Sequence, residues 1–163
     1  MTDWIDDLSN DAQLTETRTT AHAAKVRAAD KAIRAEMSEY IRSLETEIRE
    51  LGRKLAEKPN LHTSLSLHDD SDPQVQNRLQ LQISSNVGGW LETAYMRIFH
   101  GVGEKFILCD PLEEAPFNLR FAVDSSDWRV GVCAESGKRI LMTPAEAARY
   151  IVEPMVKRIR GKG

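Results

Sequence analysis

The first third of the chain has the composition and apolar spacing of one long helix. From Thr2 to Lys58 it contains no proline and a single glycine, Gly52. Ala, Glu, Arg, Lys and Leu dominate this stretch, and all are good helix formers. Pro59 ends the pattern because the residue before a proline avoids the α region. The pattern predicts a helix from Asp3 to Lys58, roughly 80 Å long at about 1.5 Å per residue.

One apolar seam runs along this predicted helix. Its steps of 3, 4 and 4 residues repeat every eleven positions, which is typical of a nearly straight helix pairing. Upstream the steps alternate between 4 and 3, the heptad spacing of a coiled coil, through positions that are partly polar: His22, Thr19, Thr15, Ala12, Leu8 and Ile5. A lone helix cannot bury such a stripe. The seam therefore predicts a coiled-coil oligomer interface made of Val26, Ala29, Ile33, Met37, Tyr40, Leu44, Ile48, Leu51 and Leu55.

The partner of this seam is expected to be a second copy of the chain, most simply in a homodimer. A helix of this length exceeds what a small domain can cover. Two alternatives are that the helix folds back on its own C-terminal domain and that it pairs with a helix of another protein. The seam contains no Asn that would specify register, so the oligomer number and the helix orientation stay open.

After Pro59 the apolar period changes from helical to alternating, which predicts strands. The alternation marks strands at 61–67, 77–84, 105–110, 117–124, 127–134 and 139–142. Segment 90–100 fits either a helix face or a hairpin arm, and we favour the strand.

A capping box opens a final helix over 144–160, in which Pro154 is expected to produce a kink. The expected fold class is α+β: a long N-terminal coiled-coil helix in residues 1–58, then an antiparallel β-meander with a C-terminal helix in residues 59–163.

Charge supports one alternative class of function. The net charge of −3 gives no global attraction to nucleic acid. Two local basic clusters are candidates for contacts with phosphates. The first contains Lys25, Arg27, Lys31 and Arg34, and the second contains Lys157, Arg158 and Arg160. A nucleic-acid-associated protein is therefore an alternative, although no zinc-finger or RNA-binding signature accompanies these clusters.

Residues that carry chemistry are few and form no known motif. Cys109 and Cys133 make no CxxC pair, and both are expected to be reduced. His62 and His68 would be about 20 Å apart on one strand, too far for one metal ion. The sequence has no nucleophile elbow and no complete glycine-rich nucleotide loop. We expect no metal and no cofactor; an enzyme with a site near the histidines or Cys109, including His100, is a second alternative.

The remaining features concern location and the kind of function. The acidic start of the chain differs from a secretory signal, and no apolar run is long enough for a membrane span. We therefore expect a cytoplasmic protein without a membrane partner. The expected function is that of a non-enzymatic assembly or adaptor protein, whose helix self-associates and whose C-terminal domain binds an unidentified protein.

Overall fold

A computed structural model of the chain describes most of its residues. The backbone is described for residues 4–58, 61–67, 75–87, 90–101, 103–124, 126–135 and 140–161. Side chains are described at 9, 10, 12–58, 79–85, 92–101, 103–124, 126–135 and 140–159. His68 therefore lies outside the described residues, and so do the side chains of Ile5, Leu8, His62 and Arg160.

A long helix, a six-stranded sheet and a shorter helix follow one another along the chain. Helix α1 spans Trp4–Ala56 and helix α2 spans Pro144–Gly161. Between them lie β1 (Leu61–Leu67), β2 (Val75–Val87), β3 (Trp90–Gly101), β4 (Phe106–Pro111), β5 (Phe117–Val123) and β6 (Val130–Ala134). Each strand pairs antiparallel with the next, in the order β1-β2-β3-β4-β5-β6. The predicted α+β class with an antiparallel meander is confirmed.

Three predicted details of the C-terminal part can be compared with this architecture. Segment 90–100 is a strand, as favoured from the sequence. The predicted strand over 139–142 is reduced to an isolated bridge between Val132 and Met142 in the described residues. Helix α2 continues through Pro154.

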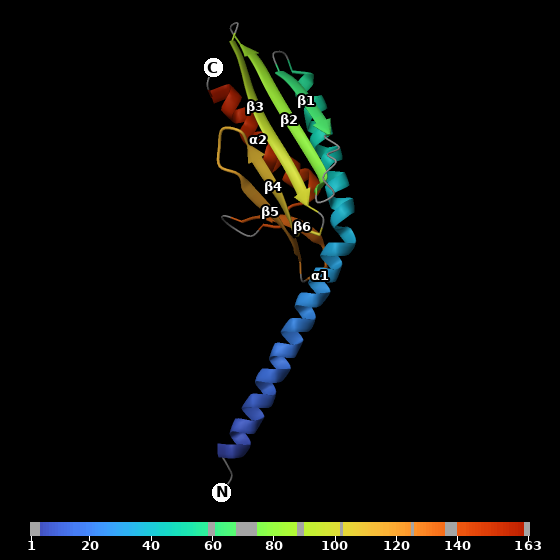
Figure 1. Ribbon diagram of the computed structural model, residues 1–163, viewed down its shortest axis with the longest axis vertical. Helices are drawn as coiled ribbons and strands as arrows, with labels where there is room; N and C mark the ends of the chain where they lie inside the picture. The colour runs from blue at the N-terminus through green and yellow to red at the C-terminus, as the bar shows by residue number, and fades with distance from the viewer. Residues whose placement is uncertain are drawn as a thin grey trace.

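Alternation along the strands gives the sheet one apolar face. The buried side chains occupy every second position: Leu79, Leu81, Ile83, Ala94, Met96, Ile98, Ile107, Cys109, Leu119 and Phe121. The positions between them point to the opposite face and are half-buried or exposed, as at Arg97, Phe99 and Leu108. Both helices lie on the apolar face (Figure 1), so the sheet has one covered side and one open side.

The second half of α1 is part of this core. Its buried side chains are Ile33, Met37, Tyr40, Ile41, Leu44 and Ile48, none more than 7% exposed. Leu51 and Leu55 are partly buried and pack against the same cluster. Full burial of one such side chain contributes about 1.5–3 kcal/mol before the loss of chain entropy. This half of α1 is therefore anchored to the sheet and to α2 by a substantial free energy.

The predicted oligomer interface is corrected by this packing. From Ile33 to Leu55 the chain's own sheet and α2 occupy the seam, so these positions are core and not a surface open to a second chain. The physical reason is that the helix does not need to be covered along its whole length. The domain covers one half, as in the fold-back alternative, and leaves the other half outside. We call residues 29–56 of α1 the docked half. Its apolar side is covered within the chain, so it does not need coiled-coil pairing.

Helix α2 begins at the capping box expected from the sequence. The Thr143 amide donates to Glu146 Oε1 at 3.2 Å, and the Glu146 amide donates to Thr143 Oγ1 at 3.3 Å. The hydrogen bond from the Thr143 amide is the largest cause of the lowered pKa of the Glu146 carboxyl. One apolar stripe of the helix is buried, made of Ala148, Ile151, Val152, Met155 and Ile159. The cap thus sets where α2 starts, and the stripe sets which side it turns to the sheet.

Tyr40 joins α1 to the segment that leads into α2. Its hydroxyl donates to the backbone oxygen of Met142 at 2.8 Å, and its ring meets Phe121 edge-on at 5.3 Å between centroids. Met142 also forms the bridge with Val132. Burial raises the pKa of Tyr40, which keeps the hydroxyl protonated as a donor. One residue of α1 therefore holds β5, β6 and the start of α2 together.

We expect Tyr40→Phe to lower the free energy of unfolding by about 1–2 kcal/mol, because it leaves the Met142 oxygen without its side-chain donor while keeping the ring contact. The measurement is chemical denaturation followed by circular dichroism. Tyr150→Phe is the matched control, because Tyr150 is 41% exposed and its ring also meets a phenylalanine edge-on. Equal stability of the two variants would contradict this role of Tyr40.

Candidate self-association surface

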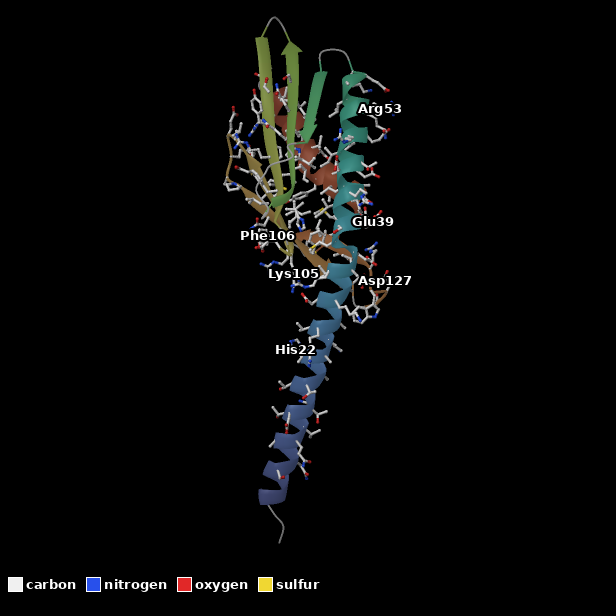
Figure 2. All side chains as sticks on the ribbon, turned by 45° about the vertical axis from the view of Figure 1, so that its right-hand side comes forward. His22, Glu39, Arg53, Lys105, Phe106 and Asp127 are labelled. Carbon is white, nitrogen blue, oxygen red and sulfur yellow. The ribbon has the colours of Figure 1, made fainter. Side chains whose placement is uncertain are left out.

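The first half of α1 projects beyond the sheet domain (Figures 1 and 2). We call residues 4–28 the overhang. Among its described side chains only that of Ala23 is half-buried, and all the others are exposed. Leu14 and Val26, the described large apolar residues in it, are 56% and 54% exposed. At about 1.5 Å per residue the overhang extends roughly 37 Å from the domain.

The seam predicted from the sequence continues along the overhang without a covering element. Its described positions, Ala12, Thr15, Thr19, His22 and Val26, are all exposed, and Figure 2 shows His22 with no other element beside it. Ala29, where the docked half begins, is half-buried. The same side of the helix that enters the core at Ile33 is thus presented to solvent upstream.

The overhang is a poor candidate for a helix that is stable alone in water. It contains four threonines, each roughly 0.5 kcal/mol less favourable than alanine in a helix. The hydroxyls of Thr19 and Thr20 bond back to the carbonyls of Thr15 and Glu16, both at 2.9 Å. Back-bonding of this kind satisfies the hydroxyl without strengthening the helix. Stability of such a segment must come mainly from packing against something else.

A cluster of ion pairs marks the point where α1 leaves the domain. Asp30 accepts a hydrogen bond from Arg34 Nε at 3.0 Å and pairs with Lys105. Lys105 lies in the β3–β4 turn, and its backbone oxygen accepts the Phe121 amide at 2.8 Å. The turn itself closes with a bond from the Glu104 amide to Gly101. The sheet therefore fixes the base of the overhang through Asp30.

His100 supports the same turn from inside the core. Its side chain is 3% exposed, and Nε2 lies 3.0 Å from the carbonyl oxygen of Glu104, to which it donates. Its ring meets Phe121 edge-on, with 6.1 Å between centroids. Burial lowers the pKa of His100, so the ring is neutral near pH 7. Through these contacts His100 stabilises the β3–β4 turn, which holds α1 at the point where the overhang begins.

Cys109, the other candidate for chemistry within the described side chains, is fully buried on β4. Burial raises the pKa of its thiol to about 12. A thiol that stays protonated is a weak nucleophile and a poor metal ligand. Cys109 therefore fills the core and is not placed for catalysis.

The β5–β6 turn carries an exposed tryptophan, Trp128. Trp128 is 50% exposed and has φ of 57°, a left-handed conformation that a bulky residue rarely adopts. The turn is held by bonds from the Trp128 amide to Asp124 and from the Asp124 amide to Arg129, both at 2.8 Å. Figure 2 shows Asp127, in the same turn, next to α1. A strained, exposed aromatic at this position suggests a contact surface.

The two basic clusters do not form one surface. Residues 25–34 lie where α1 leaves the domain, and the end of α2 lies at the opposite end of the domain (Figure 1). Several of the cations have acidic neighbours: Arg34 pairs with Asp30, Lys157 with Glu153 at 3.0 Å, and Arg158 with Glu114 at 3.0 Å. A nucleic acid that contacted both clusters would have to span the whole domain.

Other kinds of site are weakly represented in the part of the chain that is described. No group of three His, Cys, Asp or Glu side chains is placed to hold a metal ion there. A hollow on the open face is lined by Arg120, Ala122, Cys133, Ala134 and Glu135. Arg120 and Glu135 pair across it at 3.5 Å, so the two charges partly neutralise one another. Among the described residues no helix is long and apolar enough to cross a membrane.

Comparisons with known proteins add no family to these observations. No protein-family model matches the chain, and searches among curated proteins and among solved structures gave no match.

We expect Trp128→Gly to be more stable than Trp128→Ala by about 1 kcal/mol, because both variants lose the indole but only alanine keeps a Cβ in the left-handed conformation. Comparing the two variants removes the contribution of the lost ring contacts. Thermal and urea denaturation of both proteins measure the difference. An alanine variant as stable as the glycine variant would mean that the turn relaxes and holds no strain at this residue.

Proposed function

We propose that this protein is a non-enzymatic assembly or adaptor protein. In this proposal the overhang joins copies of the chain, and the sheet domain of each copy meets a protein partner. Joining copies raises the effective concentration of the second binding site, so weak contacts by each domain become strong together. The buried Cys109 thiol forms no disulfide, which fits a reducing compartment, and we propose the cytoplasm.

The observation that carries the proposal is the division of α1 into two halves. One face of the docked half is buried in the core, while in the overhang every described side chain except Ala23 is exposed. The domain does not need the overhang for its own core, because the buried cluster begins at Ile33. A helical overhang of this length, which carries a seam and whose described side chains are almost all exposed, is typical of a pairing element.

The open face of the sheet is the surface through which the domain would meet its partner. On this face Phe99 of β3 is paired with Leu108 of β4, and Arg97 with Asp110. Tyr95 and Phe106 also lie on this face and are half-buried. Aromatic and arginine side chains on one surface are enriched in protein interfaces. The face therefore has the composition of a moderately polar contact surface.

Two observations favour this proposal over the nucleic-acid and enzyme alternatives. The basic clusters are separated by the length of the domain and are partly paired with carboxylates. His100 and Cys109 are buried, and His100 is hydrogen-bonded to the backbone of the β3–β4 turn, so neither is exposed to a substrate. An assembly role uses the whole length of the overhang, whereas the nucleic-acid alternative would use only its end at Lys25 and Arg27.

The test is the molar mass of the full chain, measured by size-exclusion chromatography with light scattering. We expect a dimer or higher oligomer for the parent protein. The triple variant Ala12→Glu, Thr19→Glu, Val26→Glu should be a folded monomer, because it places charges on the overhang seam. All three positions are exposed in the single chain, so the domain's unfolding midpoint should not change.

The matched control is Thr17→Glu, Ala24→Glu, Ala28→Glu. These exposed positions lie on the other side of the overhang, and the variant adds the same charge to the same helix. It should keep the parent's mass. A parent protein that is monomeric at micromolar concentrations, or two triple variants of equal mass, would contradict self-association through the seam.

A further inference from the structure

The overhang and its base carry two blocks of opposite charge. Residues 1–16 contain five acidic side chains and no basic one: Asp3, Asp6, Asp7, Asp11 and Glu16. Residues 17–34 contain five basic side chains and a single acidic one: Arg18, Lys25, Arg27, Lys31 and Arg34, with Asp30. We call the first set the acidic tip and the second the basic base. Their described members are exposed, except Asp30, which is half-buried.

Compensation of the helix dipole explains only part of this pattern. Acidic residues stabilise the first turn of a helix, and this accounts for Asp6 and Asp7. The effect fades beyond one turn, whereas Asp11 and Glu16 lie two and three turns inside α1. Basic residues stabilise the last turn, yet Lys25 and Arg27 lie in the middle of a helix that ends at Ala56. The blocks therefore need another explanation.

We infer that two copies of this chain pair through their overhangs in antiparallel orientation, the acidic tip of each lying beside the basic base of the other. This inference rests on the proposed self-association and specifies its geometry. Packed helix axes are about 8–10 Å apart, close to one Debye length at physiological salt, so the blocks interact across the pair. A parallel pair would place tip beside tip and base beside base, which repel. The helix dipoles also oppose favourably only in the antiparallel pair.

The seam has the size pattern that an antiparallel pair requires. Its larger apolar positions in the sequence, Ile5 and Leu8, belong to the tip. Near the base the seam positions are Val26 and Ala29. In an antiparallel pair the larger residues of one helix face the smaller ones of the other, which fills the interface evenly. The small and polar positions, Ala12, Thr15, Thr19 and His22, then meet in the middle, where the helices approach closely.

The domain supplies a stop that matches the length of the overhang. The seam enters the core at Ile33, and the Asp30–Lys105 pair marks the edge of the domain. A partner helix lying on the seam can advance only to this edge, so full overlap places each tip at the other's base. Lys105 belongs to the turn at this edge and would meet the arriving tip. The two sheet domains would then lie at opposite ends of the paired helices.

The experiment measures the dissociation constant of the self-association by sedimentation equilibrium at low salt for three full-length proteins. They are the parent, a tip variant (Asp7→Lys, Asp11→Lys, Glu16→Lys) and a swapped variant that adds Lys25→Glu, Arg27→Glu and Lys31→Glu. In an antiparallel dimer the tip variant should raise the dissociation constant about tenfold or more, because each tip then repels the facing base. The swapped variant should return it to within about threefold of the parent, because tip and base are again opposite in sign.

The swapped variant also controls for fraying, because it keeps the three lysines that weaken the helix start. In a parallel dimer the parent already pairs like with like, so the tip variant would leave the dissociation constant unchanged, and this result would overturn the inference alone. Failure of the swapped variant to recover affinity would overturn it as well. A monomeric parent would overturn both this inference and the proposed self-association.

Discussion

The apolar face of the antiparallel sheet has to be covered, and the rest of the structure depends on how α1 covers it. A sheet with one apolar face is stable only when another element buries that face. Helix α2 provides one covering element through its buried stripe, and the second half of α1 provides the other. The docked residues of α1 are also those that set the position of the overhang. The same helix thereby links the stability of the domain to whatever the overhang binds.

The transition between the two halves of α1 is defined by a few contacts. Ile33 is the first seam residue in the core, and Asp30, three residues before it, is held by Lys105 and Arg34. The turn that presents Lys105 is supported by His100 from the interior. Because α1 is one continuous helix through this point, the direction of the overhang is set by the core. An interface formed by the overhang would therefore hold the open face of each sheet in a fixed orientation relative to the paired helices.

Much of the fold could be predicted from the sequence, because it depends on local signals. The absence of proline before Pro59 gave the extent of α1, and alternation gave strands such as Leu79 to Ile83. Thr143 and Glu146 marked the start of α2. The partner of the seam could not be predicted in this way. Whether Leu44 and Ile48 pack on another chain or on the chain's own sheet depends on contacts between residues far apart in the sequence, and the spacing of the seam is the same in both cases.

The candidate site was only partly visible in the sequence for the same reason. The seam positions from Ala12 to Val26 were identified by spacing, and their exposure follows from where the domain ends. The Asp30–Lys105 pair joins residues distant in sequence, and no local pattern indicates it. Ile41 was missed because it lies beside the seam, outside its 3-4-4 spacing, although it is buried in the core. Trp128 fell within the strand predicted over 127–134, but β6 begins at Val130. Its left-handed conformation depends on the hydrogen bonds of Asp124 and Arg129.

The most direct test of the account is hydrogen–deuterium exchange along α1, measured at several protein concentrations. Amides from Leu44 to Leu51 should exchange as slowly as the core strands at every concentration, because this half is buried within one chain. Amides from Ala12 to Val26 should be protected at high concentration and exchange rapidly on dilution, because only association covers them. Equal, concentration-independent exchange in both halves would contradict the division of α1 into a docked half and a pairing half.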